Sequence, residues 1–211
     1  MRIDCVARVA RVAAPLLAAH LALVAPLATA GCATTAATPE KPAVRARDLV
    51  PLAIGNQWEY RVSADGGGAT SAVKIVDKDA QGFFIDSLGN KLAPRSDGLF
   101  DGDRFLVQEP LQEGHTWIAV PKGQPNVVEK YRIAAVGTST NVPAGTFEGC
   151  VEVEAEQTVQ QGKMKMTWTF APGVGLIRIS QRVTPTGAPE RTTMTMELLK
   201  FSLQPAPAPA G

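Results

Sequence analysis

Histidine and cysteine are scarce in this sequence, and their scarcity excludes several kinds of site. The 211-residue chain has two histidines and three cysteines. His115 is the only histidine after residue 31, so a cluster of histidine metal ligands is excluded. Because His115 lies in a predicted turn, we expect a turn residue rather than a catalytic base. Cys5 lies in a segment that we expect to be removed, and the two cysteines that remain are too few for a disulfide framework.

An enzyme's set of nucleophile, acid and base is also missing. Cys150 has no base at a recognisable spacing, which favours a buried structural thiol. On strict alternation Cys150 would share a strand face with Glu152 and Glu154, unless Gly149 introduces a bulge that turns it inward. The alternating acids Glu152, Glu154 and Glu156 indicate a solvated face rather than a carboxylate or calcium site. We therefore predict a protein that is not an enzyme, with no catalytic residue, no cofactor and no metal.

Neither a charge excess nor a long helical pattern is present. The formal net charge is +1, and the part after residue 31 has 18 basic and 19 acidic residues. No basic patch interleaved with aromatic residues appears, so nucleic acid is excluded as a partner. In that part no segment keeps an apolar period of 3.6 residues over three turns, and we expect no major helix.

The first 31 residues have the three zones of an export signal. Arg2, Arg8 and Arg11 form a basic start, and a run rich in alanine, leucine and valine extends to about Leu27. Small residues then precede Cys32. A membrane-spanning helix is the competing interpretation, but the apolar stretch is only marginally long and contains two prolines and a histidine. The features predict a signal peptide that is removed.

The sequence TAGCA, residues 29–33, resembles the lipobox of bacterial lipoproteins, in which the cysteine is acylated and becomes the first residue after cleavage. Thr29 stands where that family usually has an aliphatic residue. The resemblance implies lipid attachment at Cys32. Because Ala33 rather than aspartate follows the cysteine, it also implies the outer membrane of a two-membrane cell. Residues 28–30 fit an ordinary A-x-A cleavage site as well, which would release a soluble periplasmic protein.

The segment after Cys32 is rich in threonine, proline and alanine, which predicts an unstructured tether. Residues 33–47 would have a root-mean-square span of about 20 Å, enough to hold a domain off a bilayer. At the other end, QPAPAPAG is a Pro/Ala tail with no apolar residue to pack beyond alanine. The predicted organisation is a signal peptide (1–31), a lipidated N-terminus and tether (32–47), a β domain (48–203) and a disordered tail (204–211).

The clearest strand signal in the β domain is a hairpin between Val151 and Phe170. Apolar residues fall on odd positions before the turn, with Gln157 as the exception, and on even positions after it. A two-residue turn at Gln161–Gly162 would pair Ala155 with Trp168. In this register both apolar sets share one face, whereas a slip of one residue would separate them.

Similar short alternating segments recur along the rest of the domain. Near its end the alternation changes phase at Leu198–Leu199, which predicts a β-bulge. About ten short strands with one apolar face must curl, or pair with another sheet, to bury that face. The alternation therefore predicts the all-β class.

Three motifs carry a resemblance to known proteins. PLAIGNQWEY (51–60), VPAGTFEGC (142–150) and APGVGLIRI (171–179) resemble motifs of a broad group of bacterial lipoproteins. The resemblance covers most of residues 48–203 and implies the fold of the lipoprotein-localisation factors and of uncharacterised families near them. That fold is a single antiparallel, strongly curved sheet, here of about ten strands, forming a half-barrel or open barrel. The pattern PLxxGxxW also recurs at residues 110–117, through a duplication or through one turn that is used twice. Unlike the lipid carriers, this chain has no evident helix to plug the barrel.

Large apolar side chains on the inner face are the candidates for ligand contacts. They would either line an apolar cavity or fill a packed core: Trp58, Trp117, Met164, Met166 and Trp168. The sequence thus predicts a non-enzymatic, membrane-anchored envelope lipoprotein that binds a hydrophobic or lipid-like ligand. The alternatives are a structural or assembly partner of another envelope protein, and a soluble periplasmic protein if Cys32 is not acylated.

Overall fold

The structure, a computed structural model, describes residues 44–160 and 162–205. Within these ranges the chain forms twelve strands and one 3-10 helix, η1 (Ala46–Asp48). The strands are β1 (Gln57–Ala64), β2 (Gly67–Lys78), β3 (Phe84–Asp86), β4 (Lys91–Arg95), β5 (Gly98–Phe100), β6 (Phe105–Gln108), β7 (Thr116–Ala119), β8 (Glu129–Val142), β9 (Gly145–Val159), β10 (Gly162–Ala171), β11 (Gly175–Pro185) and β12 (Arg191–Ser202).

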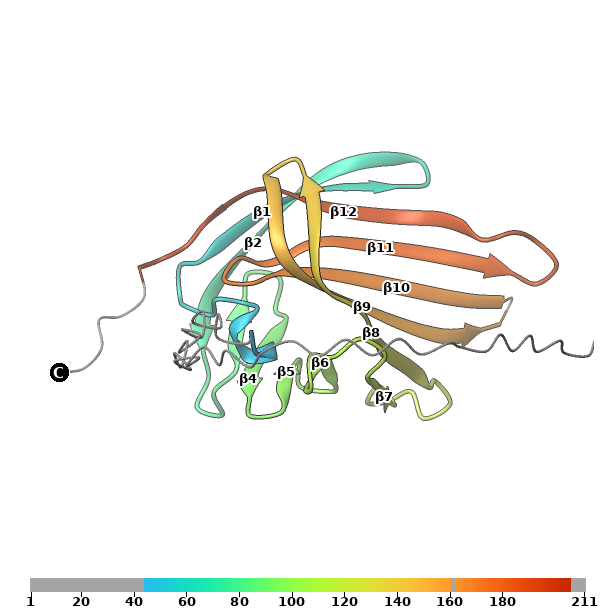
Figure 1. Cartoon of the computed structure of the whole chain (residues 1–211), viewed down its shortest axis with the longest axis horizontal. Coiled ribbons are helices and arrows are strands. Elements are labelled where there is room, and N and C mark those ends of the chain that lie inside the picture. The colour runs from blue at the N-terminus through green and yellow to red at the C-terminus, as the bar shows by residue number, and fades with distance from the viewer. Residues whose placement is uncertain (1–43, 161, 206–211) are drawn as a thin grey trace, which may run out of the picture. The chain divides into compact units, whose positions relative to one another are not determined.

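All twelve strands belong to one antiparallel sheet with the order β6-β5-β4-β3-β2-β1-β12-β11-β10-β9-β8-β7. Each strand pairs with its neighbours in the chain except β6 and β7, which form the two edges of the sheet, and β1 and β12 join the two halves. The sheet curls strongly, almost into a barrel (Figure 1). The predicted all-β class and the single curved sheet are confirmed. The count of about ten strands was low because β4 contains a proline and β5 has only three residues, so neither alternates.

The hairpin of β9 and β10 is confirmed, but its predicted register is wrong by two residues. Val159 pairs with Gly162 and Ala155 pairs with Met166, so the connection begins one position earlier than predicted. Trp168 consequently lies opposite Val153. A shift of two leaves every side chain on its original face, which is why the predicted faces remain correct.

The predicted bulge near the end of the domain is confirmed as well. Tyr60 pairs with Leu198 and Glu59 pairs with Lys200, which leaves Leu199 as the extra residue of β12. This extra residue restores an apolar contact on each side of the break and bends the strand.

A second bulge explains the position of Cys150. Between the pairs Thr138–Cys150 and Thr140–Phe147, β9 contains one residue more than β8. Gly149 lies there with φ +71°, a conformation that glycine adopts without strain. The bulge turns Cys150 inward, where it is completely buried.

The repeated motif forms the same turn twice. The backbone N–H of Gly55 donates to the carbonyl oxygen of Ile75, and the N–H of Ile75 donates back to the residue after the glycine, both at 2.9 Å. Gly114 and Ile133 repeat both bonds at the same distance. Both glycines have positive φ, +96° and +85°. Each turn leads into a strand whose second residue is the motif's tryptophan.

The N-terminal part of the described chain packs into the sheet. Ala46 and Leu49 are completely buried against the core of β5–β10. The N–H of Ala46 donates to Oε1 of Glu109 at 2.6 Å. Ala46 therefore belongs to the core although it precedes residue 48, where the domain was expected to begin. At the other end, the N–H of Gln204 donates to Oδ1 of Asn56 at 2.7 Å.

Several predictions concern residues outside the described ranges. The signal peptide, Cys32, the tether up to residue 43 and the tail from residue 206 all lie there. Over residues 44–160 and 162–205, no helix has the length and apolar character needed to cross a membrane.

Candidate ligand-binding site

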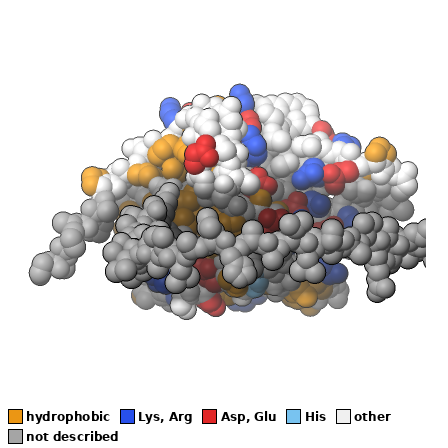
Figure 2. Space-filling view, in the orientation of Figure 1, with side chains coloured by type: hydrophobic (Ala, Val, Ile, Leu, Met, Phe, Trp, Pro, Cys, Tyr) orange, Lys and Arg blue, Asp and Glu red, His pale blue; other side chains and the backbone are white. Residues whose placement is uncertain are grey.

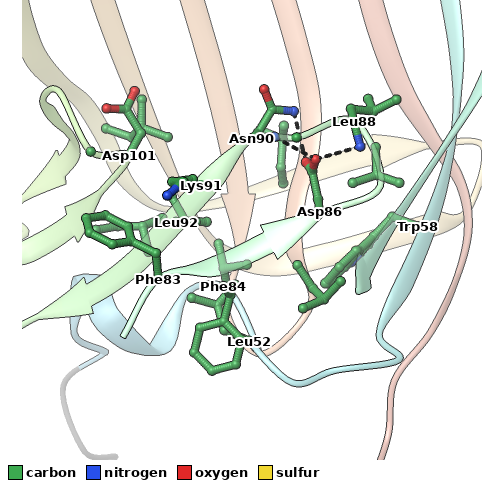
Figure 3. A pocket seen from close by; sticks show the side chains of 18 of the residues that line it. Leu52, Trp58, Phe83, Phe84, Asp86, Leu88, Asn90, Lys91, Leu92 and Asp101 are labelled. Carbon is green, nitrogen blue, oxygen red and sulfur yellow. Dashed lines mark hydrogen bonds between the residues drawn. The ribbon is translucent and has the colours of Figure 1, made fainter. Parts of the chain in front are cut away.

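A cavity of about 830 Å³ lies between the two halves of the sheet (Figure 3). Its volume falls in the range of about 300–1,000 Å³ that is typical of small-molecule sites. Both halves contribute apolar side chains to its wall, and the segment after η1 adds two more: Val50, Leu52, Trp58, Val73, Ile75, Phe83, Phe84, Leu92, Leu99, Trp168, Phe170, Leu176, Ile179 and Met196.

Two aromatic residues of β1 face this cavity with their polar atoms already bonded. The indole N–H of Trp58 donates to the carbonyl oxygen of Val174 at 2.7 Å, and the hydroxyl of Tyr60 donates to that of Leu176 at 3.0 Å. Burial raises the pKa of Tyr60, and the negative charge of Asp86 raises it further. The phenol therefore stays neutral, and both rings present apolar surface to the cavity.

The loop between β3 and β4 forms part of the polar rim. The carboxylate of Asp86 accepts hydrogen bonds from the backbone N–H groups of Leu88 (2.8 Å) and Asn90 (2.9 Å), and one from the Asn90 side chain (2.9 Å) (Figure 3). Leu88 also lines the cavity, yet it is 61% exposed. Asp86 thus fixes a tight loop that presents an apolar side chain at the rim.

A second, smaller cavity of about 210 Å³ lies beside the first. Its wall combines apolar and amide side chains with one ion pair: Arg104, Glu129, Ala155, Glu156, Gln157, Met164, Met166, Trp168 and Gln181. Trp168 lines both cavities, so the two meet at its indole ring.

Arg104 and Glu129, two charged residues of the smaller cavity, form an ion pair. Nη1 of Arg104 lies 2.8 Å from each carboxylate oxygen of Glu129, and the Tyr131 hydroxyl donates to Oε2 of Glu129 at 2.7 Å. Nε of Arg104 lies 3.2 Å from Oδ2 of Asp101. Burial raises the pKa of Tyr131, and its hydrogen bond to Glu129 raises it further, while the nearby positive charge of Arg104 acts in the opposite direction.

Four aromatic rings lead from the edge of the sheet to the cavities. His115 stacks on Trp117, Trp117 on Tyr131 and Tyr131 on Trp168, with centroid separations of 5.8, 5.1 and 6.0 Å. Interplanar angles of 13° and 16° make the two inner pairs nearly parallel. Trp168 is the last ring of this stack and the one that reaches the cavities.

The structure brings four of the five predicted contact residues to the cavities. Trp58 and Trp168 line the larger one, and Met164, Met166 and Trp168 line the smaller one. Trp117 lines neither, because it is buried in the aromatic stack and its indole N–H is bonded to Phe105. Cys32, the predicted lipid-attachment residue, lies outside the described ranges.

Many wall residues from residues 81–106 were not singled out in the sequence. They lie on strands of three to five residues or in the loops between them, which are too short to show a period. The only available signal was the run of large apolar residues around Phe83 and Phe84. Their grouping at one cavity depends on the curvature of the sheet.

The other side chains considered as chemical groups lie elsewhere. Glu154 forms an ion pair with Arg132 at 2.7 Å, and Glu156 forms one with Lys163 at 3.0 Å. On the face seen in Figure 2, acidic and basic side chains are interspersed, as in a solvated surface. The Cys150 thiol donates to the carbonyl oxygen of Phe147 at 3.3 Å, and burial raises its pKa. In the described part of the chain, no group of three histidine, cysteine or acidic side chains is placed to hold a metal ion.

Comparison with known proteins finds distant structural likenesses. No protein-family model and no curated protein matches the chain. A protein of Bacteroides fragilis, described as exported and as having a YmcC-like fold, is 14% identical with a TM-score of 0.40. A protein of Parabacteroides distasonis, described as a lipoprotein, is 11% identical with a TM-score of 0.38. Each match covers 73% of this chain and 98% of the other.

Proposed function

We propose that this protein is a membrane-anchored bacterial envelope lipoprotein that binds a hydrophobic or lipid-like ligand in the larger cavity. The observation that carries the proposal is an apolar space of about 830 Å³ inside the curved sheet. Ligand sites are typically concave, mainly apolar clefts of this size with a few polar groups at their walls, which is the character of this cavity. Its wall offers apolar rings, and the polar atoms of Trp58 and Tyr60 are bonded to the backbone.

The location follows from the N-terminal sequence. The signal-like segment, the cysteine after TAG and the Thr/Pro-rich tether support acylation at Cys32 and attachment to the outer membrane. A tether of about 20 Å would let the cavity reach molecules at the membrane surface. If Cys32 is not acylated, the same domain would bind its ligand in the periplasm.

The proposed function includes no chemical step. The two buried phenols and the thiol of Cys150 all have raised pKa values, which keep them protonated and unreactive. The carboxylates at the rim and in the smaller cavity hold a loop or an arginine. The cavity therefore serves binding rather than catalysis.

An apolar patch favours a second candidate function, the structural or assembly partner. Ile118 on the edge strand β7 is 68% exposed, Val120 just after that strand is 49% exposed, and Val128 just before β8 is 43% exposed. Exposed apolar groups beside an edge strand suit a contact with another envelope protein. None of these three residues lines either cavity, so the two functions are separable by mutation.

Titration with a neutral apolar fluorophore tests the proposed function. We expect the mature chain to bind N-phenyl-1-naphthylamine saturably at one site. Met196→Trp would fill part of the larger cavity and weaken this binding, whereas the matched control Ile118→Trp, on the outer surface, would not. Absence of saturable binding, or equal binding by both variants, would refute the proposal. If binding is confirmed, native mass spectrometry of the protein purified from its own envelope would identify the retained ligand.

A further inference from the structure

We infer that the smaller cavity is a subsite for an uncharged, hydrogen-bonding head group, carried by an amphiphile whose apolar chain occupies the larger cavity. This inference rests on the proposed function and names the class of ligand. It is carried by the adjacency of the two cavities, by two glutamines on the inner face of the sheet, and by the pairing of the charged groups around them.

The residues that line the two cavities lie in adjacent cross-strand rows of the sheet. Trp168, Ile179 and Met196 form one cross-strand row that lines the larger cavity. Met166 and Gln181 form the next row, which lines the smaller cavity. Adjacent rows on one face lie two residues apart along each strand, or about 7 Å. A single small molecule is therefore long enough to contact both rows.

Gln157 and Gln181 stand at positions where the surrounding inner face is apolar. A polar side chain on such a face is unfavourable unless it finds a hydrogen-bond partner. Nε2 of Gln157 has only the thioether sulfur of Met164, at 3.9 Å, and Nε2 of Gln181 donates to Oγ1 of Thr193 at 3.1 Å. Within the described residues, neither side-chain carbonyl oxygen accepts a hydrogen bond. A hydroxyl or amide group of a ligand would supply the missing partner.

The pairing of the charged groups around the smaller cavity indicates which kind of head group it accepts. Arg104 and Glu129 neutralise each other through two contacts of 2.8 Å, and Glu129 also accepts the Tyr131 hydroxyl. Glu156 is paired with Lys163. Each charged group of the wall thus already has a counter-ion, and a carboxylate or ammonium group would lose its water without gaining an unpaired counter-ion. An uncharged head group avoids this penalty.

The flexible side chains of Met164 and Met166 complete the wall. Methionine adapts its shape and contacts aromatic rings favourably, so these residues can close around the first carbons next to the head group. The subsite would thus recognise the junction between a polar group and a hydrocarbon chain, which is the feature that amphiphiles share.

Three amphiphiles with the same chain test the inference: dodecan-1-ol, dodecanoate and dodecylammonium. Each is titrated against bound N-phenyl-1-naphthylamine on the mature chain at neutral pH, with the alcohol below its solubility limit and the two ions below their critical micelle concentrations. We expect dodecan-1-ol to bind about tenfold more tightly than either ion, a difference of about 1.4 kcal/mol. Equal or tighter binding of dodecanoate or dodecylammonium would overturn the inference.

Matched variants test whether the two glutamines cause the preference for an uncharged head group. Gln157→Leu combined with Gln181→Leu should weaken dodecan-1-ol binding about fivefold and leave fluorophore binding unchanged, because one or two hydrogen bonds are lost. The control Gln112→Leu changes an exposed glutamine in a turn away from both cavities and should change neither affinity. Unchanged dodecan-1-ol binding by the double variant would overturn this inference but not the proposed function. Loss of fluorophore binding in the unmodified chain would instead refute the proposed function.

Discussion

The indole N–H of Trp117 donates a hydrogen bond to the carbonyl oxygen of Phe105 at 2.9 Å, and this bond joins the two ends of the sheet. Trp117 belongs to β7 and Phe105 to β6, which stand at opposite ends of the strand order. Beside it, the bidentate pair of Arg104 and Glu129 spans the same gap. Side chains rather than a backbone ladder therefore close the curve of the sheet.

Trp117→Phe tests this closure. The ring can still stack on Tyr131, but the carbonyl of Phe105 loses its donor, so we expect the free energy of unfolding to fall by about 1–3 kcal/mol in urea melts. Amide hydrogen exchange should also accelerate in β6. Trp58→Phe is the control, since it removes an indole bond of 2.7 Å to Val174 that does not join the edges. Equal exchange in β6 for both variants would contradict this role of Trp117.

Trp168→Ala separates a cavity wall from a packed core. Truncation of a buried tryptophan usually costs about 3–5 kcal/mol. We expect a smaller loss here together with altered fluorophore binding, because part of the indole borders the two cavities. Glu154→Gln is the comparison and should be nearly neutral, since its partner Arg132 is half exposed. Near-complete unfolding of Trp168→Ala would show instead that this region is a packed core.

Gly98→Ala should be strongly destabilising. A Cβ atom at this position would lie 2.2 Å from the carbonyl oxygen of Val107, in the ladder between β5 and β6. We expect a loss of about 3 kcal/mol in urea melts, because backbone must move to relieve the contact. Gly187→Ala provides the control. Its φ of +78° is unfavourable for alanine, but no atom lies within 4 Å, so the loss should be only about 1 kcal/mol.

Stability should fall at alkaline pH through the buried phenols. Burial raises the pKa of Tyr60 and of Tyr131 above the ordinary value of about 10. Above that pH the unfolded chain releases these protons while the folded protein retains them, so rising pH favours unfolding. Their contribution is thus fully present below about pH 10 and is lost above it. Urea melts at pH 9 to 11 should show a steeper decline for the unmodified protein than for Tyr60→Phe, and equal slopes would contradict the assignment.

Cys32→Ala tests the anchor. The variant should lose labelling by a fatty-acid analogue and move from the membrane fraction to the soluble periplasmic fraction. Cys150→Ala is the control, because that thiol is buried in the domain and should have no effect on fractionation. Continued partition of Cys32→Ala with membranes would place the anchor elsewhere.

Alternation in the sequence predicts faces well and registers less well. The odd positions of β9 and the even positions of β10 do share the inner face, and the bulge at Leu199 is correct. The hairpin register is wrong because two turns one position apart satisfy the same alternation, so side-chain pattern alone cannot choose between them. Likewise, the sequence allowed two positions for Cys150: on the outer face by strict alternation, or inward if Gly149 formed a bulge.

The candidate site was harder to predict from the sequence than the strands were, for a different reason. Trp58 and Trp168 were singled out as large apolar residues, but size alone could not separate them from Trp117, which is buried in the aromatic stack. Whether such a residue lines a space depends on how far the sheet curves. That curvature is set by bulges, by short strands such as β5, and by the side-chain closure at Trp117, all of which act between distant parts of the chain.

The pairing of β1 with β12 has a consequence for how the protein is made. β1 is the first strand of the domain to emerge during synthesis and β12 is the last, yet they lie side by side in the middle of the sheet. Until β12 has emerged, β1 has a partner on one side only, and β11 lacks the neighbour that links it to the first half. The backbone ladder between the two halves can therefore form only after the whole domain has been synthesised. Such a delay would suit the export that we propose for this chain, because a chain passes through an export channel unfolded.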